Sequence, residues 1–214
     1  MEKVDGPEGL LSIYHRPGSK GKMAILFLHG NGTGYDASVD VTRGFASAGH
    51  AIVIPEYPGY GGSPGTPSET SLKMTADLTY QWMLSKGFRA QDIVIFGNSI
   101  GTGPAVHIAK RPHRALVVVS GVASMTDVVR HHYPFVPISL LHDGFENDQA
   151  MRGVQGPLLV IHARDDQVVP YSHGVRLAKA GRGFLMSPET GGHGIVFEKH
   201  ISNDILGWLA ELPN

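Results

Sequence analysis

One serine in this sequence stands in a pattern typical of a catalytic nucleophile. The stretch 97–101, GNSIG, matches G-x-S-x-G and lies between the apolar run 93–96 and the small-residue segment 102–109. A sharp turn from strand to helix strains the backbone of the nucleophile, so the residues two before and two after it must lack a Cβ. The pattern predicts that Ser99 exposes its Oγ at the end of a strand. The alternative is an ordinary glycine turn between a strand and a helix.

Two later loops carry the residue types that a nucleophilic serine needs. Asp165 and Asp166 follow the apolar run 157–162, and His193 lies in a glycine-rich loop after a shorter run. A histidine activates serine by taking its proton, and a carboxylate holds the imidazole in the correct tautomer. Ligands bind at the carboxyl ends of the strands in open α/β sheets, where all these residues are expected.

His193 is the histidine best placed to act as the base. Of the twelve histidines, only His173, His193 and His200 follow the acidic loop. His173 and His200 fall in segments expected to be helical, whereas a glycine loop can bring an imidazole to the strand ends. The alternative for His193 is a structural role.

The surrounding segments predict alternating strands and helices. Apolar runs without alternation indicate buried strands, and helical spacing or capping residues mark the segments between them. Strands are expected over 10–15, 23–28, 51–54, 93–96, 115–119, 157–162 and 183–186, and helices over 38–48, 72–85, from the serine turn to about 110, 171–180 and 195–212. This order predicts an α/β fold with a mostly parallel twisted sheet and helices on both faces. The first two strands are expected to form a hairpin, with 10–15 at the sheet edge.

The segment 120–153 breaks this pattern. It contains two prolines and no long apolar period. We expect a small cap or lid there, above the sheet. The chain 1–214 is therefore expected to be a single domain with a minimal cap.

Composition excludes several classes of protein. The 214 residues are 42% hydrophobic, with a formal net charge of −1 and no cysteine. This balance provides no basic surface for nucleic acid, and the absence of cysteine excludes disulfides and thiolate catalysis. No apolar run approaches the ~20 residues of a membrane helix, and the first ten residues do not read as a signal peptide. We expect no integral membrane segment and a cytoplasmic location. The oligomeric state stays open.

A histidine group in the cap invites comparison with metal sites. His131, His132 and His142, with Asp143, match no standard zinc spacing. We therefore expect solvated cap residues there, with no metal and no cofactor.

Four stretches together resemble a known family: 27–34 FLHGNGTG, 56–69 EYPGYGGSPGTPSE, 93–109 IVIFGNSIGTGPAVHIA and 161–174 IHARDDQVVPYSHG. They resemble the α/β-hydrolase-fold serine hydrolases, most closely the compact small-cap branch that includes depalmitoylating thioesterases and bacterial esterases. The resemblance covers nearly the whole chain and implies the α/β-hydrolase fold. The chain order Ser, Asp, His is also that of this family.

The resemblance selects the acid of the triad. In this family the acid stands immediately before x-V-V/I-P, which implies Asp166 and leaves Asp165 as a neighbour; the alternative is that either aspartate only caps the following helix. Two departures are Ala163 where glycine is common and Glu56 where aspartate is usual. The membrane-bound depalmitoylating members also carry a cysteine-rich anchor, and this chain has no cysteine.

The fold also implies where the oxyanion and the substrate bind. The backbone N–H groups of Ile100 and Asn31 are expected to form the oxyanion hole; the alternative is that the Asn31 loop is only a tight turn. Tyr60 is expected at the mouth of the site, although a structural loop is nearly as good a reading. Tyr133, Phe135, Val136 and Leu140 are expected to cover an acyl pocket, or alternatively to form a partner interface.

The function implied is a metal-independent hydrolase of small-molecule acyl esters or thioesters, acting through an acyl-enzyme on Ser99. Amide, peptide or carbon–carbon bond hydrolysis on the same triad is an alternative, as is a non-catalytic binding protein on a hydrolase scaffold.

Overall fold

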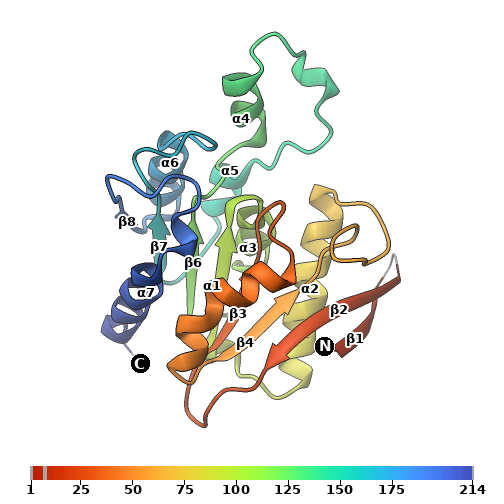
Figure 1. Cartoon of the computed structure of the whole chain (residues 1–214), viewed down its shortest axis with the longest axis vertical. Helices are drawn as coiled ribbons and strands as arrows, with labels where there is room; N and C mark the ends of the chain where they lie inside the picture. The colour runs from red at the N-terminus through yellow and green to blue at the C-terminus, as the bar shows by residue number, and fades with distance from the viewer. Residues whose placement is uncertain (1, 7–8, 214) are drawn as a thin grey trace.

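The computed structural model describes residues 2–6 and 9–213. They form one eight-stranded sheet with helices packed on it (Figure 1). The strands are β1 (Glu2–Gly6), β2 (Gly9–Arg16), β3 (Ala24–Leu28), β4 (Ala51–Pro55), β5 (Ile93–Asn98), β6 (Ala115–Val119), β7 (Leu158–Ile161) and β8 (Phe184–Met186). Their order in the sheet is β1-β2-β4-β3-β5-β6-β7-β8. From β4 to β8 every neighbouring pair is parallel, which confirms the predicted mostly parallel sheet.

The prediction that 10–15 and 23–28 form a hairpin is wrong. β2 pairs antiparallel with β4, and its other neighbour is β1. β2 is therefore not the edge strand. β1 was not predicted, because the sequence EKVDG has a single strongly apolar residue and alternates only between half-buried and exposed positions.

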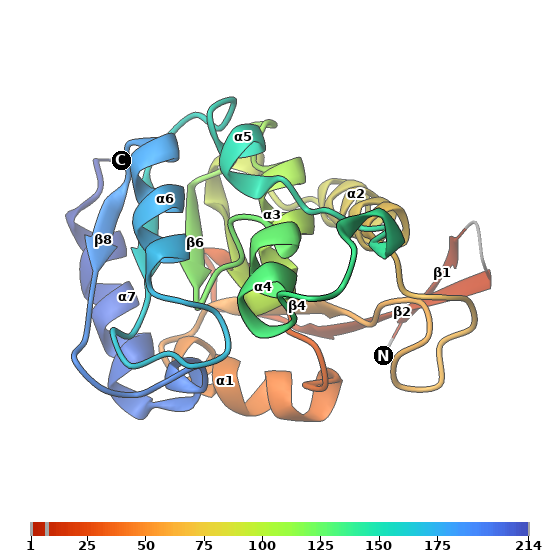
Figure 2. The ribbon, with the colours of Figure 1, turned by 90° about the horizontal axis from the view of Figure 1, so that it is seen from above.

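Helices cover both faces of the sheet, as predicted. They are α1 (Tyr35–Ser47), α2 (Glu69–Ser85), α3 (Thr102–Ile108), α4 (Met125–His132), α5 (Asn147–Met151), α6 (Ser172–Gly181) and α7 (Lys199–Glu211), and single 3₁₀ turns lie at Ala90–Asp92, Ser99–Gly101, Ile138–Leu140 and Ile195–Phe197. Viewed from above, α1 and α7 lie on one side of the sheet, and α2, α3, α5 and α6 lie on the other (Figure 2). The expected helix 195–212 is divided into a 3₁₀ turn and α7.

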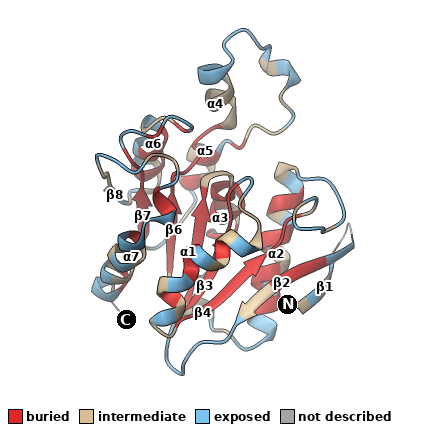
Figure 3. Cartoon of the chain, viewed as in Figure 1, coloured by how far each residue is buried: buried red, intermediate tan, exposed pale blue. Residues whose placement is uncertain are grey.

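The central strands are buried on both faces, which explains their unbroken apolar sequences (Figure 3). In β3, Leu26 packs in the core layer beneath α2 and α3, and Phe27 packs in the layer beneath α1 and α7. Phe27 meets Phe96 of β5 edge to face at 4.9 Å between ring centroids. A rigid, doubly covered sheet of this kind holds the loops at its carboxyl ends in fixed positions.

The segment between β6 and β7 carries α4 and α5, and we call residues 120–153 the cap. In Figure 1, α4 and the loop that follows it project beyond the carboxyl ends of the central strands. Arg176 of α6 holds the base of the cap through the carboxylates of Asp127 and Asp148, at 2.5 and 2.6 Å. Among the described residues, every helix is too short or too polar to cross a bilayer.

Candidate active site

The serine turn has the geometry that its glycines predict. Ser99 follows β5 with φ 53°, in the left-handed region that non-glycine residues rarely occupy. A Cβ on Gly97 would lie 2.7 Å from the Cβ of Ala105, and one on Gly101 would overlap the carbonyl oxygen of Leu28. The turn therefore requires glycine at both positions, because β3, β5 and α3 approach closely there. An ordinary glycine turn, the alternative considered for this stretch, would not explain why Ser99 itself has a positive φ.

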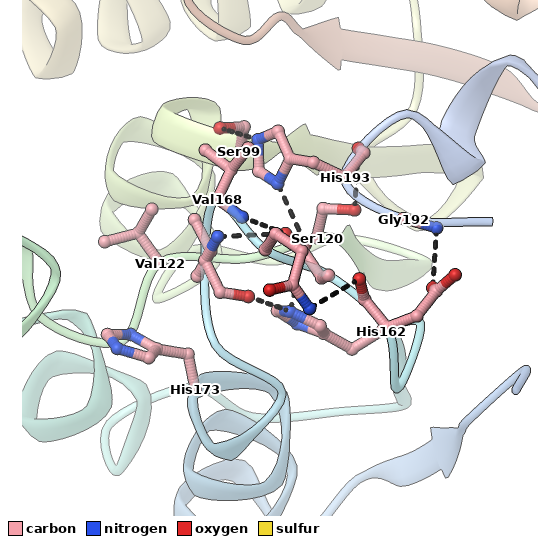
Figure 4. Close-up of polar contacts among 12 residues, drawn as sticks. Ser99, Ser120, Val122, His162, Val168, His173, Gly192 and His193 are labelled. Atoms are coloured by element: carbon pink, nitrogen blue, oxygen red, sulfur yellow. Dashed lines mark hydrogen bonds and ion pairs between the residues drawn. The ribbon is translucent and has the colours of Figure 1, made fainter. Parts of the chain in front are cut away.

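The structure brings together the three side chains that the sequence selected. Ser99 Oγ lies 2.9 Å from His193 Nε2 (Figure 4). His193 Nδ1 lies 2.9 Å from Asp166 Oδ2. The three residues come from the loops after β5, β7 and β8. The Asp166 side chain is fully buried, whereas a quarter of the His193 side chain is exposed. The imidazole can therefore exchange a proton between the serine and a molecule from solvent.

Asp166 is held ionised by its surroundings. Burial raises the pKa of this carboxyl, but hydrogen bonds from His162, His193 and the Val169 N–H outweigh that effect and hold the pKa well below its usual range. Oδ1 accepts the N–H groups of Val168 and Val169, both at 2.9 Å, which leaves Oδ2 for His193. The carboxylate is thus a fixed negative charge beside the imidazole.

Sequence reasoning missed two residues that position the acid and the base. His162, at the end of the run PLLVIH, donates from Nε2 to the Val169 carbonyl at 2.9 Å, and the same nitrogen lies 3.3 Å from Asp166 Oδ2. Ser120 donates from Oγ to the His193 carbonyl at 3.1 Å, and its φ is 49°. A polar residue at the end of a buried strand was the available signal in both cases, since such residues face the carboxyl edge of the sheet.

Asp165 has a different role from its neighbour. Its Oδ1 accepts the N–H of Gly192 at 2.8 Å, and Asp166 alone contacts the imidazole of His193. Asp165 therefore ties the loop of the predicted base to the loop of the predicted acid.

The loop after β3 lies beside the serine. A Cβ on Gly30 would be 3.2 Å from the Cβ of Ser99, so the Gly30–Asn31 peptide adjoins the predicted nucleophile. Within the part of the chain that the structure describes, the Asn31 N–H donates to no other group of the protein. Ile100 lies in the first turn after Ser99, where its N–H precedes the helical hydrogen bonds. Both predicted oxyanion donors therefore adjoin Ser99.

Tyr60 reaches the same loop. Its hydroxyl donates to Asn31 Oδ1 at 2.6 Å, so the Asn31 side chain has a structural partner that sequence reasoning did not assign. Burial and the charge of Glu56 raise the pKa of Tyr60, which keeps the hydroxyl protonated as a donor.

Tyr133 and Phe135 are not brought to a closed acyl pocket. Their exposed fractions are 63% and 97%, and Val136 and Leu140 of the same cap loop are also exposed. The loop projects from the sheet rather than folding over it, since 133–137 has two prolines and makes a turn instead of a helix.

The rings of the cap residues His131 and His132 lie edge to face, with 4.9 Å between their centroids. Over residues 2–6 and 9–213, no three His, Asp or Glu side chains are grouped so that they could hold a metal ion. His132 instead has its Nε2 2.8 Å from the Val168 carbonyl.

The sheet order and the strained serine turn define an α/β hydrolase, and a family model described as alpha/beta hydrolase fold matches residues 24–155. The chain belongs to the α/β-hydrolase fold family.

Among the relatives of this chain, one carries the name of the fold and another is named as a lipase. It is 30% identical over 181 residues to alpha/beta hydrolase domain-containing protein 17B of Homo sapiens, covering 83% of this chain and 62% of the relative. It is 33% identical over 176 residues to the lysophosphatidylserine lipase ABHD12 of Rattus norvegicus, covering 72% and 44%. The chain thus spans less than two thirds of these curated relatives. The solved structure of Est1E from Butyrivibrio proteoclasticus with ferulic acid bound has a TM-score of 0.78, at 18% identity, with 99% and 98% of the chains covered.

Proposed function

We propose that this protein is a serine hydrolase of carboxylic esters or thioesters that works through an acyl-enzyme on Ser99. The observation that carries the proposal is the continuous contact from Ser99 Oγ through the His193 imidazole to the buried Asp166 carboxylate, at 2.9 and 2.9 Å. Serine, base and orienting acid in contact form the Ser-His-Asp triad, an arrangement for nucleophilic catalysis by a hydroxyl group.

In the acylation step, Ser99 Oγ attacks the carbonyl carbon of the substrate and His193 Nε2 takes the serine proton. The negative charge that develops on the carbonyl oxygen is stabilised by the N–H groups of Asn31 and Ile100. The leaving alcohol or thiol receives the proton from His193 as its bond to the acyl carbon breaks. A water molecule, deprotonated by His193, then attacks the acyl-enzyme and releases the acid.

The names of relatives and structural neighbours support an ester as the substrate. One is named as a lysophosphatidylserine lipase, and the structural neighbours include proteins titled as esterases and lipolytic enzymes. We propose a small-molecule acyl substrate, no resident cofactor or metal and a cytoplasmic location. The cap acts as a minimal lid in this proposal, with its loop over residues 133–140 outside the site.

The decisive test is covalent labelling. A fluorophosphonate probe should modify the wild-type protein on the peptide that contains Ser99, and Ser99→Ala should abolish both labelling and turnover of p-nitrophenyl acetate. Ser85→Ala is the matched control, because Ser85 is exposed at the end of α2 and its hydroxyl donates to the carbonyl of Trp82 in the same helix. Mass spectrometry after mixing with p-nitrophenyl acetate should find one acetyl group on the same peptide.

Two results would contradict the proposal. Labelling or ester turnover that survives Ser99→Ala would place the nucleophile elsewhere. A wild-type protein that neither labels nor hydrolyses any ester or thioester of a chain-length series would favour a non-catalytic binding protein.

A further inference from the structure

The carbonyl of Gly30 is held by two donors. His29 Nδ1 lies 2.9 Å from this oxygen and Thr33 Oγ1 lies 2.8 Å from it. Because a carbonyl can only accept, Nδ1 carries the proton. The Gly30–Asn31 peptide is trans, so its C=O and the Asn31 N–H point in opposite directions. Fixing the carbonyl therefore fixes the direction of the Asn31 N–H.

His29 is itself held from several sides. Its side chain is fully buried, with ring centroids 4.2 Å from Tyr57 and 5.5 Å from Tyr60. Its Nε2 lies 3.4 Å from Glu56 Oε1, and among the described residues neither atom has a hydrogen-bond partner. The imidazole and the carboxylate thus face each other in a buried region, so removing the charge of one changes the surroundings of the other.

Glu56 joins the beginning of the loop to its end. Oε2 accepts the N–H of Tyr35 at 3.0 Å, at the first turn of α1, while Oε1 faces His29. Gly61 packs against the carboxylate, since a Cβ there would lie 2.7 Å from Glu56 Cδ. Glu56, which stands where aspartate is usual in the family, therefore contacts both ends of the loop 29–35.

We infer that His29, Thr33 and Glu56 are positioning residues that aim the Asn31 N–H at the oxyanion of the reaction. The inference rests on the proposed function and assigns these side chains a role in the transition state, without contact to substrate. A preoriented donor stabilises the oxyanion more than the ground-state carbonyl, because it need not reorganise as charge develops. Loss of the orientation should therefore lower kcat and leave KM nearly unchanged.

The test compares matched variants of Thr33 and Glu56. Thr33→Val removes the hydroxyl with little change of shape, and we expect kcat for p-nitrophenyl acetate to fall by about 10- to 100-fold, less than the loss of a whole oxyanion donor. Thr33→Ser restores the hydroxyl and should recover most of kcat. Glu56→Gln keeps an acceptor for Tyr35 but removes the charge facing His29, and should show the same selective loss of kcat.

A second measurement separates positioning from general damage. Phenylboronic acid forms an anionic tetrahedral adduct on a serine, so its inhibition constant should rise in Thr33→Val by the same factor as kcat falls. The melting temperature should stay within a few degrees of the wild type. Thr42→Val is the control, because the Thr42 hydroxyl bonds the carbonyls of Ser38 and Val39 within α1 and does not touch the loop.

The inference is overturned if Thr33→Val keeps its kcat and boronate affinity, if Thr33→Ser fails to recover them, or if Thr42→Val shows the same loss. A failure of the proposed function is a separate result, since it would appear in the wild type as an absence of turnover that depends on Ser99.

Discussion

The carboxylate of Asp165 accepts the backbone N–H of Gly192 at 2.8 Å, one residue before the histidine that Asp166 contacts. Two adjacent aspartates thus hold the same loop in different ways. Asp165 binds the backbone of the loop, and Asp166 binds the imidazole.

This difference predicts unequal effects of the same substitution. Asp166→Asn should lower kcat for ester hydrolysis by about 10⁴-fold, because an amide stabilises neither the correct tautomer nor the imidazolium. Asp165→Asn keeps an oxygen that can accept the Gly192 N–H and should lose far less. Steady-state kinetics of both variants, with circular dichroism to verify folding, measures the contrast. A reversed order of severity would move the acid to Asp165.

The stability of the fold should depend on pH through His173. Burial is the main reason that the pKa of His173 is lowered to about 4. Arg176 and His162 lower this pKa further, whereas the carboxylates of Asp127 and Asp148 raise it and offset part of the shift. Its Nδ1 accepts the N–H of Ala123 at 3.1 Å, which only the neutral ring can do.

Between the unfolded pKa of about 6.5 and the folded pKa of about 4, the unfolded chain binds a proton at His173 that the folded chain does not. Stability from this group is therefore complete above about pH 6.5 and is lost as the pH falls toward 4. His173→Gln can still accept the Ala123 N–H and should flatten this dependence by up to about 3 kcal/mol. Urea unfolding of both proteins across this range measures the difference, and parallel curves would refute the assignment.

Two glycines should respond in opposite directions to alanine. Gly101→Ala places a Cβ 2.8 Å from the His29 carbonyl and even closer to that of Leu28, so it should cost at least about 3 kcal/mol of unfolding free energy or prevent folding. Gly207 lies exposed within α7, with nothing within 4 Å of a Cβ, so Gly207→Ala should add about 0.5–1 kcal/mol. Denaturant melts compare the two, and a tolerated Gly101→Ala would contradict the close packing of the serine turn.

Chelation should leave catalysis intact. In the proposed mechanism an imidazole activates the nucleophile and N–H groups stabilise the oxyanion, so no step uses a Lewis acid. Dialysis against EDTA should leave kcat unchanged, measured beside a sample with the metal restored. A loss of activity that Zn²⁺ or Mg²⁺ reverses would redirect attention to the cap histidines.

The sequence by itself determined the class of fold and the local geometry of the serine turn. Ser99 is strained because glycines at 97 and 101 let strand and helix approach, and that constraint acts within a few residues of chain. The buried parallel strands were equally predictable, since apolar runs without alternation report burial on both faces. His193 and the loop with Asp165 and Asp166 were found because they follow such strands, so their meeting at one sheet edge followed from the order of elements. The choice of Asp166 over Asp165 came from the resemblance to the family's motif.

Only the tertiary structure decided which distant groups became partners. β2 pairs with β4 rather than with β3, the strand that follows it in the chain, because a ladder of hydrogen bonds depends on where the edge of the sheet is open and not on local periodicity. Nothing near Glu56 in the sequence indicates that its carboxylate faces His29, 27 positions earlier, or that Ser120 holds the carbonyl of His193. The cap loop likewise reads as apolar cover, yet Phe135 projects into solvent. Contacts of this kind arise when separate segments pack, so composition and spacing within one segment do not contain them.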